Sequence, residues 1–135
     1  MKNYFDDKEL HLLDATLQEK IYMWHLRDQI LNPVREAKGK ITCSSGHRNE
    51  KHNTEARGSK TSHHLCKDGY SAADLIPCEC TLEILFEYIR DNFSYAELIL
   101  EYDQGVVHVS SNIDPKKNAK RTSRRKLVDG EKVYY

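Results

Sequence analysis

The stretch that organises the chain is Ser62-His63-His64-Leu65-Cys66-Lys67-Asp68-Gly69-Tyr70-Ser71-Ala72-Ala73-Asp74. Two adjacent histidines lie in its polar, turn-rich half, and Asp74 follows at the start of a short apolar run. A third histidine, His108, lies further on in an apolar stretch. Two imidazoles and a carboxylate suit zinc, and three protein ligands leave a fourth position for water, as in catalytic rather than structural zinc sites. The sequence therefore predicts a zinc site built around this stretch.

The composition indicates one globular domain with a polar surface. Hydrophobic residues make up 39% and charged residues 31% of 135 positions, and 21 basic residues balance 21 acidic ones. We expect a single domain over residues 1–135, with a core at about 16–111 and a basic C-terminal extension at 112–135. No apolar run approaches the roughly 18 residues of a membrane helix, so no membrane partner is expected. The first residues lack the apolar stretch of a signal peptide, so we expect synthesis in the cytoplasm.

The four cysteines are Cys43, Cys66, Cys78 and Cys80, and they form no CxxC pair. For a cytoplasmic chain of this size we expect four free thiols rather than disulfides. Cys66 lies inside the predicted site and is an alternative metal ligand.

The hydrophobic pattern predicts an α+β fold, with helices against a small antiparallel sheet. A helix is predicted over residues 16–31. The Asn32-Pro33 pair that follows either ends or kinks this helix, or Pro33 starts a further turn. Its predicted apolar face contains Leu17, Ile21, Trp24, Leu26 and Ile30. A second helix is predicted over residues 81–92, with Thr81 as its N-cap.

Strands are predicted at residues 41–45, 72–76, 96–102 and 106–111, and residues 133–135 suggest a last edge strand. The short Asp103-Gln104-Gly105 link predicts an antiparallel hairpin between the third and fourth strands. Residues 46–69 show no periodicity, and a loop of this length favours a functional role. The hairpin would bring Glu101 near His108, where Glu101 could act as a general base. The alternative from the residues alone is that Glu101 and His108 are solvent-facing strand residues.

The order of these motifs resembles the zinc D-Ala-D-Ala carboxypeptidase family, peptidoglycan metallopeptidases that share a fold with hedgehog signalling domains. The resemblance covers about residues 26–111. It rests on Ser45-Gly46-His47-Arg48, Asn53, Gly58-Ser59, Ser62-x-His64, Gly69, Ala72-x-Asp74 and Val107-His108-Val109-Ser110.

The resemblance implies a role for each of six residues. It assigns zinc (Zn2+) to His64, Asp74 and His108. Glu101 is then the catalytic base, and Arg48 holds a substrate carboxylate, which a guanidinium can bind with two parallel hydrogen bonds. Ser62 hydrogen-bonds the substrate or a neighbouring ligand.

The chain departs from the family pattern near both ends of the predicted site. More residues separate His64 from Asp74 than the family usually has, so Cys66-Lys67-Asp68 resembles an insertion. His63 and Asp68 are the alternative ligands if the register differs.

The second departure concerns the catalytic base. Gly105 stands where many relatives carry a catalytic Glu, so Asp103 is a second candidate beside Glu101. His47 replaces a common Tyr, and Val107 replaces a common Trp.

The function implied by the resemblance is a zinc metallopeptidase that cleaves peptidoglycan stem peptides or cross-links. D-Ala-D-Ala, L-Ala-D-Glu and cross-bridge bonds are all open, for a carboxypeptidase or an endopeptidase. We expect a monomeric phage lysin or phage-associated hydrolase, which reaches the cell wall after release or as part of a virion. The alternative is a non-catalytic module of the same fold that binds zinc or wall peptides. A basic run at residues 116–126 could bind an anionic polymer, but it lacks interleaved aromatic residues, so a nucleic-acid partner is not expected.

Overall fold

Residues 2–135 are described by a computed structural model, and their backbone is organised around one six-stranded sheet. The strand order is β1-β2-β4-β3-β5-β6. The strands are β1 (Ile41–Ser45), β2 (Tyr70–Pro77), β3 (Glu97–Glu101), β4 (Val106–Asn112), β5 (Arg121–Val128) and β6 (Glu131–Tyr134). The predicted α+β class is confirmed. The sheet differs from the prediction in one pair, because β3 and β5 run parallel while all other neighbours are antiparallel.

Apolar and polar side chains alternate along the central strands, so the sheet has one apolar face and one polar face. Leu98 and Leu100 of β3 are fully buried in the core, as are Val107 and Val109 of β4. Because successive strand side chains point to opposite faces, Glu97, Ile99 and Glu101 lie on the other face together with His108. These polar positions of the two strands therefore share one side of the sheet.

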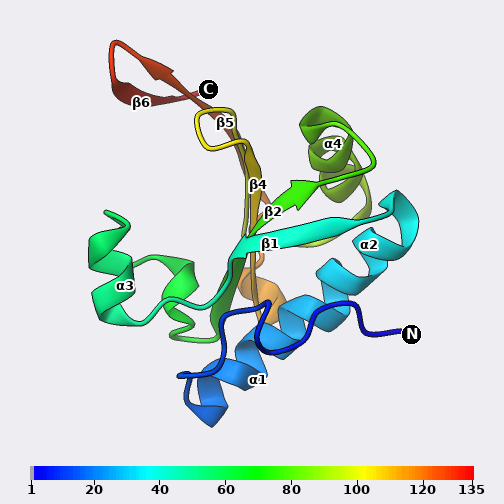
Figure 1. Ribbon diagram of the computed structural model, residues 1–135, viewed down its shortest axis with the longest axis vertical. Coiled ribbons are helices and arrows are strands. Elements are labelled where there is room, and N and C mark those ends of the chain that lie inside the picture. Colours follow the sequence, from blue (N-terminus) through cyan, green and yellow to red (C-terminus); the bar gives the residue numbers. More distant parts are fainter. Residues whose placement is uncertain (1) are drawn as a thin grey trace.

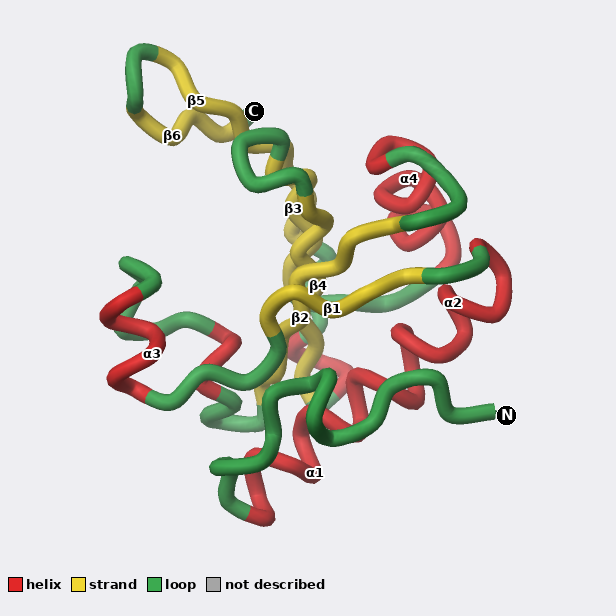
Figure 2. Tube along the Cα trace, in the orientation of Figure 1, coloured by secondary structure: helices red, strands yellow, loops and turns green. Residues whose placement is uncertain are grey.

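Helices cover the apolar face. They are α1 (Leu17–Leu26), the π-helical segment η1 (Arg27–Leu31), α2 (Asn32–Lys38) and α4 (Leu82–Asn92). The helices α1, α2 and α4 lie on one side of the central strands, whereas the short α3 (Glu50–Glu55) lies on the other (Figures 1 and 2). The predicted N-cap of α4 is confirmed, since the Thr81 hydroxyl accepts a hydrogen bond from the Ile84 amide at 3.1 Å.

The first predicted helix is confirmed in position but not in its buried face. Leu26 and Ile30 are buried, whereas the side chains of Leu17 and Ile21 are 67% and 48% exposed. The apolar residues in the N-terminal half of α1 therefore lie largely outside the core. Pro33 does not end the helix but stands at the start of α2, directly after the π-helical η1, so the alternative of a further turn is confirmed.

Two segments contain more structure than the sequence predicts. Residues 46–69 include α3 and a 3-10 turn, η2 (His63–Leu65), which the Ser62 hydroxyl caps. The basic run at residues 116–126 contributes most of β5, although most of the side chains of this strand are exposed. The β5–β6 hairpin projects from the body of the molecule (Figure 1), and β6 forms the outer edge close to the predicted residues 133–135.

All four cysteines are free thiols, as predicted. Among residues 2–135, no helix has the length and apolar character needed to cross a membrane.

Candidate metal centre

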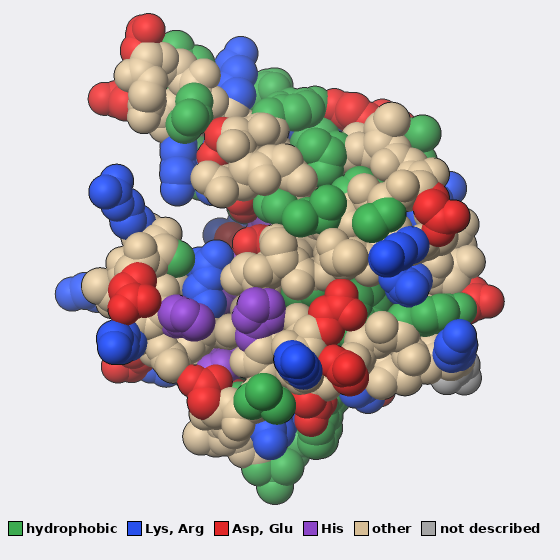
Figure 3. All heavy atoms as spheres, viewed as in Figure 1, with side chains coloured by type: hydrophobic (Ala, Val, Ile, Leu, Met, Phe, Trp, Pro, Cys, Tyr) green, Lys and Arg blue, Asp and Glu red, His purple; other side chains and the backbone are tan. Residues whose placement is uncertain are grey.

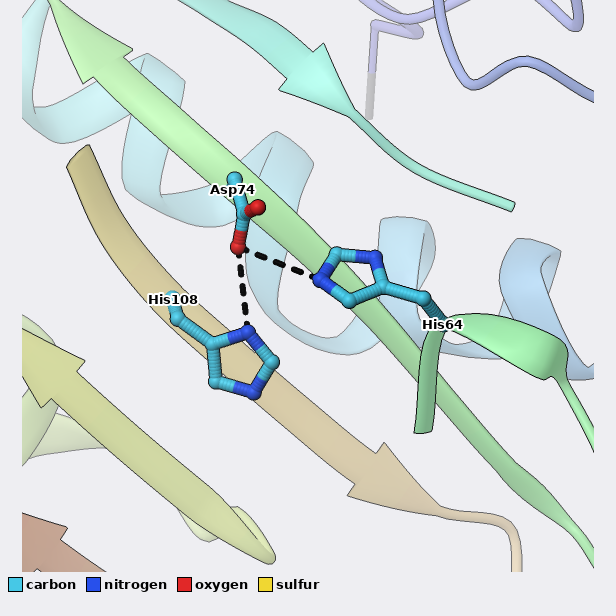
Figure 4. Close-up of side chains that lie close together, drawn as sticks. All are labelled: His64, Asp74 and His108. Atoms are coloured by element: carbon cyan, nitrogen blue, oxygen red, sulfur yellow. Dashed lines mark hydrogen bonds and ion pairs between the residues drawn. The ribbon is translucent and has the colours of Figure 1, made fainter. Parts of the chain in front are cut away.

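Three side chains far apart in the sequence meet on the polar face of the sheet. One potential ligand atom from each of His64, Asp74 and His108 lies within 4.8 Å of the others. All three residues are buried, and both imidazoles point toward the same carboxylate (Figure 4). The structure therefore brings together the predicted set of zinc ligands.

Strand register explains how two of these residues meet. Asp74 on β2 lies directly opposite His108 on β4 in the antiparallel pair, with both side chains on the same face. His64 comes from η2, and its carbonyl accepts a hydrogen bond from the Arg48 amide at 2.8 Å. This contact ties the histidine turn to the segment that follows β1.

The His64 ring is oriented by the backbone. Its Nδ1 lies 2.7 Å from the carbonyl oxygen of Gly46, and a carbonyl can only accept, so Nδ1 carries the proton. Nε2 is then left with a free lone pair, 3.2 Å from Asp74 Oδ1. Such an outer hydrogen bond fixes the tautomer of a metal-binding histidine.

The His108 ring is oriented by a carboxylate that the sequence analysis did not single out. Its Nδ1 lies 3.0 Å from Asp74 Oδ1, and its Nε2 lies 3.3 Å from Glu97 Oε1. Glu97 also lies 3.0 Å from His63 Nδ1 and 3.3 Å from Arg121 Nη2. Glu97 and Glu101 are four residues apart on one strand, so their side chains share a face of the sheet. This spacing is visible in the sequence and could have identified Glu97.

Charges within the cluster compensate for its burial. Burial alone would raise the pKa of Asp74, but the two imidazoles hold it well below its ordinary value. Burial would lower the pKa of His108, but hydrogen bonds with Asp74 and Glu97 raise it to about 10. Burial dominates at His64 and lowers its pKa. The carboxylate is thus ionised, and the cluster is ready to stabilise a cation.

The extra residues between His64 and Asp74 are absorbed by a tight turn. Cys66, Asp68 and Gly69 all have positive φ values, of 56°, 57° and 86°. The Gly69 carbonyl accepts a hydrogen bond from the Ile113 amide at 3.0 Å, which anchors the turn beside the end of β4. The turn therefore accommodates the extra residues, and His64 and Asp74 still lie within the same cluster.

The alternative ligands lie outside the cluster. The ring of His63 stacks on Tyr70 at 3.9 Å between centroids, and its Nδ1 lies 2.8 Å from Ser110 Oγ. Asp68 lies in the exposed turn. The Cys66 thiol is buried against the His64 carbonyl at 3.6 Å, and burial raises its pKa to about 12, which disfavours the thiolate that metal binding requires.

The two candidate bases occupy different environments, although both contact Arg125. Glu101 lines the cleft above the cluster, and Arg125 Nη2 donates to its Oε1 at 2.7 Å. Burial raises the pKa of Glu101, the charge of Asp74 adds to this, and Arg125 opposes it. Asp103 does not line the cleft. Both of its carboxylate oxygens accept hydrogen bonds from Arg125 at 2.9 Å. The geometry favours Glu101 over Asp103.

The two predicted substrate-binding residues border the same cleft. Arg48 Nε donates to Ser45 Oγ at 3.0 Å, and its Nη2 lies 3.5 Å from Asp74 Oδ2. The Ser62 hydroxyl accepts from the His64 amide at 3.2 Å, so it supports the histidine turn. The cleft has a volume of about 910 Å³ and is open to solvent above the three clustered side chains.

The donor set fits a zinc ion. His64 directs the free lone pair of its Nε2 toward the Asp74 carboxylate, and His108 would offer Nδ1 once its ring has released a proton to the solvent. Together with the ionised carboxylate, these nitrogens form a three-ligand set of the kind found at catalytic zinc. Each imidazole has an outer partner, the Gly46 carbonyl or the Glu97 carboxylate, as metal-binding histidines usually do. The arrangement could hold a metal at the floor of an open cleft.

An α+β domain with such a cluster in an open cleft has the architecture of a metal-dependent hydrolase. The family model for Peptidase M15 matches residues 4–111, so the chain belongs to this family of zinc-dependent metallopeptidases. The match confirms the resemblance found in the sequence. No curated protein matches the chain.

Proposed function

We propose that the protein is a zinc-dependent peptidase that hydrolyses peptide bonds in the stem peptides or cross-links of bacterial peptidoglycan. The observation that carries the proposal is the buried His64–Asp74–His108 cluster, which lies at the floor of an open cleft. Membership of the Peptidase M15 family supports the same chemistry.

The proposed mechanism divides the work among the residues of the cleft. His64, Asp74 and His108 would hold the zinc ion, which would supply Lewis-acid activation of a water molecule and of the scissile carbonyl group. Arg48 binds a substrate carboxylate through its guanidinium and so positions the peptide. Glu101 accepts the proton of the attacking water on a carboxylate oxygen and then donates it to the departing amine.

We further propose that the enzyme is a monomeric phage lysin or virion-associated hydrolase, which meets its substrate after release from the cytoplasm. All three candidate ligands come from a single copy of the chain, on η2, β2 and β4, which supports a monomer.

The test combines zinc content with peptidoglycan turnover for the wild type and three variants. We expect the wild type to hold about one zinc ion and to release peptide fragments. His108→Ala should lose the metal, whereas Glu101→Gln should keep it and lose turnover by about 10²–10⁴-fold. His52→Ala removes an exposed histidine of α3 and should match the wild type. Full turnover by Glu101→Gln would exclude Glu101 as the base.

The second candidate is a non-catalytic module that binds zinc or wall peptides. It is favoured by one contact, the ion pair between Glu101 and Arg125, which engages one oxygen of the proposed base. Zinc binding without release of peptide fragments by the wild type would establish this alternative.

A further inference from the structure

The cleft above the metal centre has two walls from different parts of the chain. One wall consists of residues 56–62, which follow α3. The other comes from the β5–β6 hairpin through Arg125, Lys132 and Tyr134. Figure 3 shows the face hollowed between the two walls, with Lys and Arg side chains on both sides of the hollow. The hairpin lies outside residues 4–111, so the family match says nothing about its role.

The acidic side chains of the cleft have partners within the protein, but two of its cations do not. Asp74 is paired with two histidines, Glu97 with two histidines and an arginine, and Glu101 with Arg125. No ion pair within residues 2–135 involves Arg57 or Lys132. The unbalanced charge of the cleft is therefore positive.

The positions of these two cations are set by the backbone. Arg57 closes the C-terminal turn of α3, where its amide donates to the Thr54 carbonyl at 3.0 Å. Lys132 and Tyr134 are two residues apart on β6, so both side chains point to one face, and Tyr134 pairs with Arg125. Exposed Lys and Arg side chains usually point into solvent, but Arg57 and Lys132 border a single cleft from its opposite walls.

We propose that Arg57 and Lys132 form an anion subsite that selects acidic peptides, in which a second carboxylate lies apart from the one bound by Arg48. This inference rests on the proposed peptidase function and deepens it by naming the substrate class. Ile76 and Ile99 also line the cleft and provide apolar contact for small aliphatic side chains beside the metal centre. The preferred substrate is thus a peptide with carboxylates at two separate positions.

The test uses two synthetic peptides that differ by one charge. They are L-Ala-γ-D-Glu-L-Lys-D-Ala-D-Ala and the same peptide with the free carboxylate of D-Glu amidated. We expect the zinc-loaded wild type to show a lower KM for the acidic peptide. The variant Arg57→Gln/Lys132→Gln should raise that KM about threefold to tenfold, as for the loss of two exposed ion pairs, with little effect on the amidated peptide. The preference should weaken in high salt.

A matched control removes two charges from the same two regions, α3 with the residues after it and the β5–β6 hairpin, but not from the cleft. Lys51 on α3 and Lys126 on β5 are exposed and do not line the cleft, so Lys51→Gln/Lys126→Gln should keep the preference. An equal loss in this control would assign the effect to overall charge and overturn the subsite. A wild type without preference between the peptides would overturn it as well.

Calorimetric binding of the same peptides separates this inference from the peptidase function. If the wild type binds zinc but hydrolyses neither peptide, the peptidase function fails. The subsite still stands if binding of the acidic peptide weakens in Arg57→Gln/Lys132→Gln and not in the control. It falls if both variants bind the two peptides as the wild type does.

Discussion

At the scale of single residues, the contact between Glu97 and His108 gives the clearest expectation. The Glu97 carboxylate lies 3.3 Å from His108 Nε2 and so leaves Nδ1 directed toward Asp74. We predict that Glu97→Gln lowers zinc affinity by about 10–100-fold, the usual cost of losing an outer partner of a metal-binding histidine. Competition with a chromophoric chelator measures this affinity. Glu87→Gln, on an exposed position of α4, is the control, and equal affinities in both variants would contradict the role given to Glu97.

The three residues of the cluster were predictable from the sequence, but the side chains that contact the cluster and the candidate base were predictable only in part. His64, Asp74 and His108 stand in motifs with recognisable neighbours, and the hairpin that carries His108 follows from alternation and a short turn. Glu97 could have been found from its two-residue periodicity with Glu101. Arg125 could not, because its contact with Glu101 depends on pairing between strands that no local pattern connects.

At the scale of elements, β5 is held to the sheet by a buried ion-pair network. The Arg125 side chain is 9% exposed and contacts both Glu101 and Asp103. Removing the cation leaves two carboxylates without a partner, so Arg125→Gln should lower the free energy of unfolding by about 2–4 kcal/mol. Arg124→Gln removes a surface contact of 3.5 Å to Glu83 and should cost less than about 1 kcal/mol. Urea unfolding compares the two, and equal midpoints would contradict the prediction.

The turn that absorbs the insertion gives a second expectation at this scale. Gly69 has φ 86°, and a Cβ there would lie 2.7 Å from Asn112 Oδ1. Gly130 has φ 79°, but a Cβ there would meet no atom within 4 Å. Both Gly→Ala changes should cost about 1 kcal/mol of backbone strain. Gly69→Ala should cost more because of the clash, and thermal unfolding of the two variants isolates that difference. Identical melting temperatures would mean that the turn relaxes freely.

Elements with local signals were predicted better than those that depend on distant partners. Thr81 marks the start of α4 by its capping hydroxyl, and the β3–β4 hairpin follows from its turn. The predicted apolar face of α1 was wrong at Leu17 and Ile21, because periodicity shows which residues share a helix face but not how much of that face the rest of the fold covers. The strand β5 was missed because its sequence has no alternation of apolar and polar residues, and it becomes a strand by pairing with the distant β3.

At the scale of the whole molecule, zinc should stabilise the fold. The three candidate ligands come from η2, β2 and β4, so the folded state holds them together and the unfolded chain does not. With free zinc at about 100 times the dissociation constant, the gain is about 2.7 kcal/mol. That corresponds to a rise in melting temperature of roughly 10 °C for a domain of this size. Differential scanning calorimetry with zinc and with a chelator measures the shift. His108→Ala should abolish it and His52→Ala should retain it; a shift that survives His108→Ala would place the metal elsewhere.

The parallel pairing of β3 with β5 also imposes an order on folding. β4 follows β3 after a tight turn, so the β3–β4 hairpin closes a short loop and can form early. β5 reaches β3 only after the chain has passed through β4 and residues 113–120, and such non-local pairings form slowly. A chain caught before that last pairing holds every zinc ligand, but neither the cation beside Glu101 nor the second wall of the cleft.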